Sequence, residues 1–316
     1  MSWNNKTEVL EKVKRHGPLL EWASDNLKND KEVVLTAVKS LGWALKYASP
    51  ELKDNKKIAL EAVRNYGYAL ESVSERLKND KEVVLEAVKN DGTALISTSN
   101  DLKNDKEVVL TAVKENGKSL EYVSGNLKNN KEVVTEAIKN YSWAFEYASP
   151  ELKDNKDFVI MALKENGNLL QYVSDRLKND KDVVIESVNN YGSLCWASEE
   201  IRGNKNIVME AVKNNGYEIQ YASNELKNDK EVIITALKEN KMAFACIGKD
   251  IKEEYFSKEK NYSAESIEFQ LVKPWERLEK EIEKSKLENS WENDNDIENN
   301  NPWEDKLNNN SSDLER

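Results

Sequence analysis

The chain of 316 residues is polar and acidic, with charged side chains at 33% of its positions, a mean hydropathy of −0.78 and a net charge of −11. Much of that charge falls in residues 254–316, where 17 acidic residues outnumber 9 basic ones. An acidic chain is poorly suited to neutralising a phosphate backbone, so a nucleic-acid partner is not expected. No run of 18 apolar residues and no apolar N-terminal stretch is present, which predicts a cytoplasmic protein without membrane insertion.

A unit of about 25 residues recurs ten times between Asn5 and Glu253. The units begin at Asn5, Asp30, Asn55, Asp80, Asp105, Asn130, Asn155, Asp180, Asn204 and Asp229, and unit positions are counted from these residues. Position 1 is always Asp or Asn, whose side chains cap helix starts, so a helix is predicted to begin there. Position 13 is glycine in eight units, namely Gly17, Gly42, Gly67, Gly92, Gly117, Gly167, Gly192 and Gly216. We expect this glycine to end the helix in a left-handed conformation.

The apolar pattern within the unit predicts stacked helices. Positions 4, 5, 6, 8 and 9 form an apolar arc wider than the stripe of an ordinary surface helix, so the helix must contact a neighbour on each side. The first unit has Glu8 and Lys12 where later units have apolar residues, which predicts that positions 4 and 8 face the preceding unit. Apolar positions 15, 16, 18 and 19 predict a short second helix, and the serine that follows predicts one further capped turn.

These patterns predict an all-α, right-handed-type helical solenoid of about ten 25-residue helix-turn-helix repeats, followed by a disordered acidic C-terminal tail. The predicted solenoid covers residues 1–253, and an apolar segment at 254–273 is interpreted as its C-terminal cap. A charged helix is predicted at 274–288. Residues 289–316 are rich in Asn and acidic residues and too poor in apolar ones to fold.

Two motifs resemble a known repeat family. They are Asp80-Lys81-Glu82-Val83-Val84-Leu85-Glu86-Ala87-Val88-Lys89 and Ala44-Leu45-Lys46-Tyr47-Ala48-Ser49. The unit that contains them resembles the family catalogued as domain of unknown function 4116, over about residues 5–253. The resemblance implies a helical repeat without an established activity.

The sequence offers no constellation for catalysis, and we predict that the protein is not an enzyme and holds no cofactor or metal. His16 is the single histidine, which excludes the usual zinc sites and most histidine relays. The carboxylates that recur at position 7, such as Glu86, precede a cation by three residues in most units and are interpreted as solvated surface pairs. An enzyme with a misread carboxylate is kept as an alternative.

Lysine occupies position 2 in every unit, and position 24 is lysine in nine units and Arg202 in one. A ridge of cations could bind phosphates or nucleic acid, and this is the main alternative function. Acidic or Asn residues flank the position-2 lysine in most units, so the local charge is mixed and the alternative is weaker than protein binding.

Aromatic residues at the variable positions 12 and 14 are the best candidates for binding a protein partner, although packing against the neighbouring helix is an equally good interpretation. These candidates are Tyr66, Tyr141 and Tyr191 at position 12, with Trp43, Tyr68, Trp143 and Tyr217 at position 14. The aromatic residue at position 18 recurs too steadily for a specificity site and is assigned to the core. Three Trp-Glu pairs in the tail, at Trp275, Trp291 and Trp303, are candidate short linear motifs. This interpretation is favoured for Trp291 and Trp303, and the alternative is that Trp275, with the helix at 274–288, docks onto the last repeat. The sequence therefore predicts an interaction scaffold for an unidentified protein partner.

Overall fold

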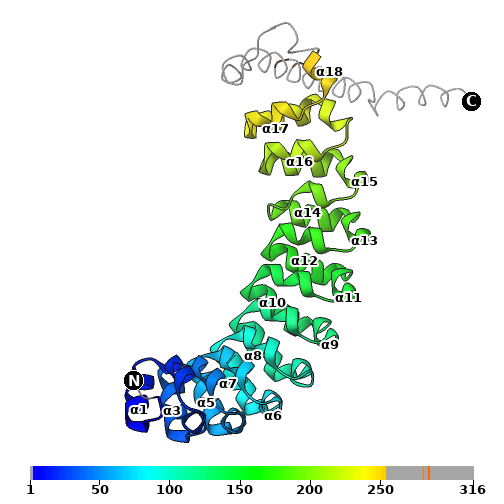
Figure 1. Cartoon of the computed structure of the whole chain (residues 1–316). Coiled ribbons are helices and arrows are strands. Elements are labelled where there is room, and N and C mark those ends of the chain that lie inside the picture. Colours follow the sequence, from blue (N-terminus) through cyan, green and yellow to red (C-terminus); the bar gives the residue numbers. More distant parts are fainter. Residues whose placement is uncertain (1–2, 254–279, 281–283, 285–316) are drawn as a thin grey trace, which may run out of the picture. The chain divides into compact units, whose positions relative to one another are not determined.

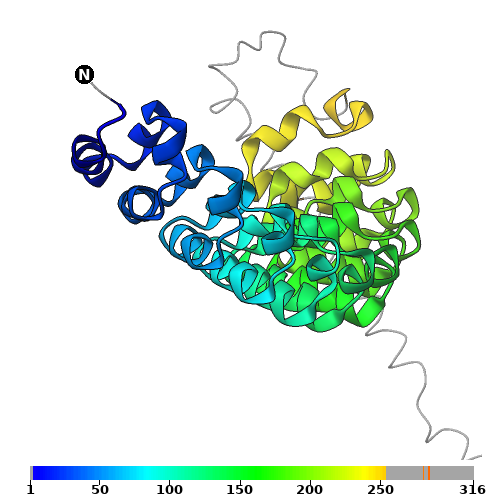
Figure 2. The same ribbon diagram turned by 60° about the horizontal axis from the view of Figure 1, so that its bottom comes forward.

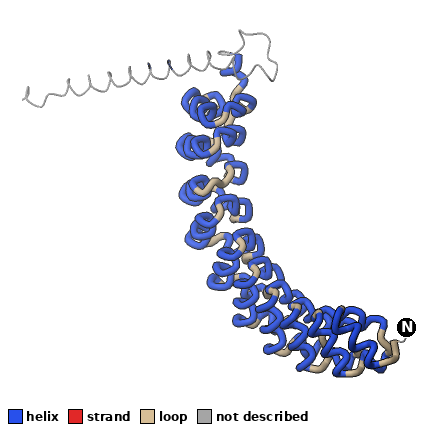
Figure 3. Tube along the Cα trace, turned by 90° about the vertical axis from the view of Figure 1, so that its left-hand side faces the viewer, coloured by secondary structure: helices blue, strands red, loops and turns tan. Residues whose placement is uncertain are grey.

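The computed structural model describes residues 3–253 together with Lys280 and Lys284, and the described residues contain helices but no strand (Figure 1, Figure 3). They form two compact units, which divide between Ser198 and Glu199. Three predicted segments lie outside the described residues: the cap at 254–273, the helix at 274–288 except for its two lysines, and the tail at 289–316. Trp275, Trp291 and Trp303 lie outside them too.

Each repeat contains three helices in the same order. A long α-helix comes first: α1 (Lys6–Arg15), α3 (Lys31–Ser40), α5 (Lys56–Asn65), α7 (Lys81–Asn90), α8 (Lys106–Glu115), α10 (Lys131–Asn140), α12 (Lys156–Glu165), α14 (Lys181–Asn189), α16 (Lys205–Asn214) and α17 (Lys230–Glu239). A 3-10 helix follows: η1 (Gly17–Trp22), η2 (Gly42–Tyr47), η3 (Gly67–Ser72), η4 (Gly92–Ser97), η6 (Gly117–Tyr122), η7 (Ser142–Tyr147), η8 (Gly167–Tyr172), η9 (Leu194–Trp196), η10 (Gly216–Tyr221) and η12 (Lys241–Ala245).

The third helix is a single turn that follows the serine recurring in nine of the ten units. These turns are α2 (Asp25–Lys28), α4 (Pro50–Lys53), α6 (Glu75–Lys78), η5 (Leu102–Asn104), α9 (Gly125–Lys128), α11 (Pro150–Lys153), α13 (Asp175–Lys178), α15 (Glu199–Arg202), η11 (Leu226–Asn228) and α18 (Lys249–Ile251). Within residues 3–198 the long helices lie side by side in chain order (Figure 1, Figure 2). The predicted helical repeat is confirmed, with one more helix in each unit than a plain helix-turn-helix.

The long helices begin where the Asp and Asn residues predicted. In every repeat the position-1 side chain accepts a backbone N–H of the first turn, as Asp105 Oδ1 does from Glu107 at 3.0 Å and from Val108 at 3.1 Å. The side chains of positions 4, 5, 8 and 9 that follow are buried, for example Val108 and Ala112. Capping and burial therefore fix the start and the inner face of the helix together.

The glycine at position 13 has a different role from the predicted one. No described glycine has a positive φ, so the left-handed helix end is wrong. A Cβ added to Gly17 would lie 2.3 Å from the carbonyl oxygen of Ala37, which is at position 8 of the next repeat. At Gly17 the two backbones approach too closely for a side chain, whereas the sixth and tenth repeats have Ser142 and Lys241 at this position. The same contact shows that position 8 faces the preceding repeat, as predicted.

The second helix is 3-10 rather than α, and this changes which side chains face outward. In a 3-10 helix, residues three apart lie above one another. In η2, Gly42 and Leu45 share a buried face that continues to Ala48, whereas Trp43 and Lys46 share an exposed face. Position 18 lies at the border of the buried face. Its tyrosines are half-buried, which fits the predicted core position with the polar tip outward, but Trp22 and Trp196 are exposed and do not fit it.

Adjacent repeats are joined by one backbone hydrogen bond that recurs along the chain. The N–H of the serine at position 20 donates to the carbonyl of position 24 in the preceding repeat, as Ser149 does to Lys128 at 2.9 Å. The first repeat has no predecessor, and Trp3 supplies that carbonyl to Ser24 at 3.0 Å. The Trp3 ring also lies 4.3 Å from the Lys12 ammonium group. Trp3 thus lies against Lys12 on the polar face predicted for the first repeat, while Glu8 stays exposed.

Candidate binding surface

Side chains at positions 14, 17 and 18 of the 3-10 helices form a repeating surface, here named the outer face. Positions 14 and 17 lie three residues apart and therefore share one face of the 3-10 helix. This face points away from the core, and position 18 borders it. In most of the 3-10 helices the remaining positions are buried, so the outer face is where the side chain can differ between repeats. Adjacent 3-10 helices from η1 to η8 contact one another, which makes the outer face continuous over these repeats.

The seven described candidate residues are all at least partly accessible. Trp43, Tyr66 and Tyr217 are 38% exposed, Tyr191 is 78% exposed, and Tyr68, Tyr141 and Trp143 are half-buried. The structure brings some of them together in pairs: the rings of Tyr66 and Tyr68 lie 6.0 Å apart. Position 12 itself lies at the end of the long helix, against the glycine of the preceding repeat, as Tyr66 does against Gly42.

Position 18 supplies the aromatic partners that the sequence analysis missed. Trp43 meets Tyr47 edge to face at 5.5 Å, and Trp143 meets Tyr172 of the next repeat at 6.3 Å. Trp22 is 61% exposed. One sequence feature could have indicated a 3-10 helix here. The segment between position 13 and the capping serine is short, and a helix of three residues per turn fits it.

Lysines at position 24 lie along the same surface and contact these rings. The ammonium groups of Lys128 and Lys153 lie 6.0 Å and 5.9 Å from the rings of Tyr147 and Tyr172. Both also donate to a backbone carbonyl in their own repeat, Lys153 to Glu146 at 2.5 Å. Burial lowers the pKa of both lysines. They are therefore partly desolvated cations, each lying against one tyrosine ring of the next repeat.

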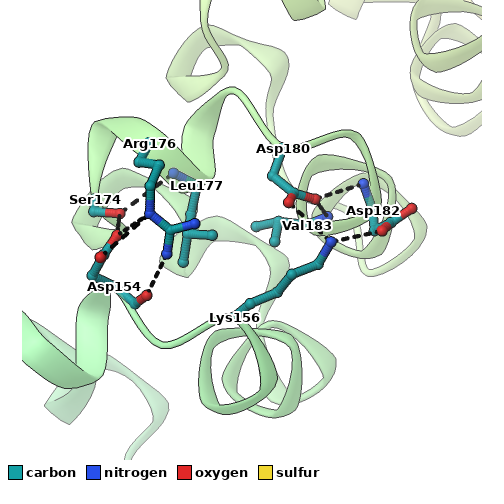
Figure 4. Close-up of polar contacts among 8 residues, drawn as sticks. All are labelled: Asp154, Lys156, Ser174, Arg176, Leu177, Asp180, Asp182 and Val183. Atoms are coloured by element: carbon teal, nitrogen blue, oxygen red, sulfur yellow. Dashed lines mark hydrogen bonds and ion pairs between the residues drawn. The ribbon is translucent and has the colours of Figure 1, made fainter.

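Lysines at position 2 are engaged between repeats. Lys156 contacts Asp180 at 2.9 Å and Asp182 at 2.7 Å, both at the start of the next long helix (Figure 4). Lys6, Lys56, Lys81 and Lys205 bind the equivalent pair of carboxylates in their next repeats. A cation already neutralised by two carboxylates adds little to phosphate binding, so this row of lysines does not favour nucleic acid.

A second row of polar contacts runs beside the first. Arg176 donates to the carboxylate of Asp154 at 3.1 Å and to its backbone carbonyl at 2.7 Å, and Ser174 donates to the same carboxylate (Figure 4). Hydrogen bonds from Ser174 and Arg176 lower the pKa of Asp154. These groups satisfy one another across the repeat boundary, and their role is to join repeats.

A family model matches the chain five times in tandem. The model is described as a domain of unknown function (DUF4116), and its matches cover residues 5–53, 55–103, 105–153, 155–202 and 204–252. The chain belongs to the DUF4116 family. Each DUF4116 match spans two of the 25-residue repeats, so the family unit contains two outer-face segments. No curated protein and no solved structure matches the chain.

Two further features of the described DUF4116 repeats are a hollow and a pair of free cysteines. A hollow of about 300 Å³ opens beside Glu199, Arg202 and Tyr221. Cys195 and Cys246 are free and half-buried. Within residues 3–253, no three His, Cys, Asp or Glu side chains converge in a way that could hold a metal ion. No helix of the described part is long and apolar enough to cross a membrane.

Proposed function

We propose that this chain is a non-enzymatic scaffold that binds a protein partner through the aromatic outer face, with the Trp-Glu pairs of the tail as additional contacts. The observation that carries the proposal is the separation of roles within each repeat. The residues that join repeats are the same from copy to copy, whereas position 14 of the outer face is Trp43, Tyr68, Thr93 or Lys118 in successive repeats. Partly exposed aromatic rings on a rigid frame are typical anchors for protein partners.

Charge favours protein over nucleic acid as the partner. Five of the ten position-2 lysines each bind two carboxylates, and two of the position-24 lysines are partly desolvated against tyrosine rings. An extended partner fits this surface because each repeat adds one outer-face segment, about 10 Å from the last for packed helices. Solenoid repeats commonly present such extended surfaces to their partners.

The proposal can be tested by comparing proteins captured from the lysate of the native host by four full-length baits. These are the natural chain, an outer-face variant (Trp43→Ala/Trp143→Ala), a tail variant (Trp275→Ala/Trp291→Ala/Trp303→Ala) and a control variant (Lys89→Ala/Lys139→Ala). The two control lysines lie on the long helices and pair only with Glu86 and Glu136 on the same helix. We expect a protein retained by the natural and control baits and lost from the outer-face variant.

Raised salt and nuclease treatment distinguish protein binding from the alternative function, nucleic-acid binding. Capture through aromatic anchors should persist when salt is raised, because it rests on apolar contact. Capture that disappears with moderate salt and with nuclease would instead identify a nucleic-acid-associated protein. Equal capture by the natural bait and the outer-face variant would contradict the assigned surface.

A further inference from the structure

The boundary between the eighth and ninth repeats lacks a contact that the seven preceding boundaries have. At each of those, the hydroxyl of the position-20 serine donates to the side chain at position 25 of the preceding repeat. The acceptors are Asn29, Asp54, Asn79, Asn104, Asn129, Asp154 and Asn179. In the eighth repeat position 25 is Gly203, which has no side chain to offer. Among the described residues, the hydroxyl of Ser223 in the ninth repeat therefore has no acceptor of this kind.

The backbone at this boundary is otherwise the same as elsewhere. The N–H of Ser223 donates to the carbonyl of Arg202 at 3.0 Å, and Ser223 Oγ accepts the N–H of Leu226 at 3.3 Å. Gly203 does not have a positive φ, and the nearest atom to an added Cβ would lie 3.4 Å away, at ordinary contact distance. A side chain would therefore fit at Gly203. The glycine is not required by the backbone, and what it provides is the space of an absent side chain.

The hollow of about 300 Å³ opens at this boundary. Its walls come from α15 (Figure 1), from the end of η10 and from the residues that follow η10, all in the unit that begins at Glu199. The lining residues are Glu199, Arg202, Tyr221, Ala222, Ser223 and Asn224. Ala222 is buried and Tyr221 half-buried, so the hollow has an apolar wall beside its polar groups. A volume at the lower end of the range for ligand pockets suits a small molecule or a single side chain.

Arg202 brings a donor without an acceptor to the hollow. Position 24 is lysine in the nine other units, and only the eighth has arginine there. The Arg202 side chain is 30% exposed, but its Nε is buried and has no hydrogen-bond partner among the described residues. Its Nη2 lies 4.0 Å from the carboxylate of Glu199, a side chain that is 96% exposed. A buried N–H without an acceptor is unfavourable, and an anion bound in the hollow would supply that acceptor.

Two other boundaries show which group fits beside a serine hydroxyl and an arginine. The carboxylate of Asp154 accepts from the Ser174 hydroxyl and from the Nε of Arg176 at 3.1 Å (Figure 4). The carboxylate of Asp54 is bound in the same way at an earlier boundary. At Gly203 the serine and an arginine are present, with the arginine at position 24 instead of position 22, and the carboxylate is missing. The chemistry of the repeat thus indicates a carboxylate as the ligand.

We propose that the hollow binds a carboxylate group, which takes the place of the absent position-25 side chain. The carboxylate accepts from the Ser223 hydroxyl and from the Arg202 guanidinium, whose planar N–H donors match a carboxylate. The rest of a short ligand packs on Tyr221 and Ala222. The group belongs either to a free organic acid or to an acidic side chain of a protein partner. This site is separate from the Trp43 and Trp143 anchors, which lie in the unit that ends at Ser198.

Acetate is the first probe, because it is the part of an aspartate side chain that Gly203 lacks. The full chain is labelled with nitrogen-15 arginine, and its Nε–H signals are followed by NMR as acetate replaces chloride at neutral pH and constant ionic strength. The signal of Arg202 is identified by its loss in Arg202→Lys. We expect this signal to shift and to saturate with a dissociation constant in the millimolar range, since so small a ligand makes few contacts. The other arginine signals should not shift.

Matched substitutions at Gly203 then locate the ligand. Gly203→Asn restores the residue type of the other repeats and fills the position from within, so it should weaken acetate binding by at least about tenfold. Gly203→Ala adds the same Cβ without an acceptor and should leave the affinity nearly unchanged. Ser223→Ala should weaken binding, and Glu199→Gln should strengthen it by removing a like charge from the lining. Circular dichroism of each variant checks that the helices remain folded.

Two further carboxylates distinguish the sources of the group. Butyrate adds an aliphatic chain that can pack on Tyr221 and Ala222, and it represents a free acid. An aspartate residue blocked at both ends represents an acidic side chain of a protein partner. Tighter binding of butyrate would assign the hollow to free acids, and tighter binding of the blocked aspartate would assign it to a partner. Either result supports a carboxylate site.

Three results would overturn the inference. They are an Arg202 signal that none of the three carboxylates shifts, equal acetate affinity of the natural chain and Gly203→Asn, and saturation by inorganic phosphate without saturation by any carboxylate. The last result would mean that the hollow recognises a different anion. None of these results bears on the proposed function, which is tested at Trp43 and Trp143.

Discussion

Replacing Gly117 by alanine is expected to destabilise the stack because of a backbone contact between repeats. An added Cβ would lie 2.4 Å from the carbonyl oxygen of Ala137 and 2.8 Å from the Cβ of Tyr141, distances that force the two repeats apart. Overpacking of this kind costs about 1–3 kcal/mol. The movement would also stretch the 2.7 Å hydrogen bond from the Gly117 N–H to Asn140 Oδ1, worth about 1 kcal/mol.

The matched control is Gly125→Ala. Gly125 begins α9, is exposed, and has no atom within 4 Å of an added Cβ. Loss of glycine freedom in the unfolded chain should therefore stabilise this variant by about 0.4–1 kcal/mol. The same gain applies to Gly117→Ala, which leaves a net destabilisation of about 1–3 kcal/mol. The two alanine substitutions should thus have opposite signs.

Urea unfolding followed by circular dichroism measures both variants, and hydrogen exchange at α8 and α10 shows whether the effect is local. A third variant, Gly117→Asn, separates close approach from a left-handed backbone. Asparagine tolerates a left-handed conformation but not a close contact, so it should be at least as destabilising as alanine. The reasoning would be refuted if Gly117→Ala stabilised the protein as Gly125→Ala does, or if asparagine restored natural stability.

Three further predictions concern other parts of the repeat. Ala112→Glu should cost several kcal/mol because it buries a charge between repeats, whereas Thr111→Glu on the partly exposed side should stay within about 0.5 kcal/mol, both measured by urea unfolding. Burial opposes ionisation of Asp105, but hydrogen bonds from Lys81 and from a backbone N–H outweigh burial and lower the pKa of this carboxyl. The ionised Asp105 therefore stabilises the folded state above about pH 4, and this stabilisation is lost as the pH falls. Asp105→Asn should therefore flatten the fall in unfolding free energy between about pH 5 and 3, and an unchanged slope would contradict the assignment. Tyr191 has a φ of 60°, so Tyr191→Gly should raise the thermal midpoint through a gain of about 1 kcal/mol, and a lower midpoint would show that its ring matters more.

The repeat, its helix starts and its stacking direction could be predicted from sequence because each depends on local chemistry. Asp105 caps a helix wherever its neighbours allow one, and the apolar arc that follows requires contacts on both sides. Glu8 and Lys12 correctly marked the face that has no preceding repeat. What they did not reveal is that Trp3 supplies the missing carbonyl there, since a backbone contact has no side-chain pattern.

The errors have a common origin in backbone geometry. A glycine signal is the same for a left-handed residue and for a close approach, so the position of Gly17 was informative while its role was not. Steady recurrence of an aromatic residue was interpreted as a core position, but η2 is a 3-10 helix in which Tyr47 lies at the border of the buried face. The candidate aromatic residues at position 14 were found, but their partners at position 18 were assigned to the core.

The identical contacts at repeat boundaries also limit how the gene can change in length. Gain or loss of a whole 25-residue unit, about 75 nucleotides, recreates the bond from the position-20 serine to the position-24 carbonyl at the new boundary. A shorter change alters the path of the chain inside one unit, as in the eighth repeat, where one residue fewer coincides with the left-handed Tyr191. Duplication of whole units is thus the least costly way for such a chain to lengthen, and the likeness of residues 42–56 to 142–156 is what a duplication of four units would leave behind.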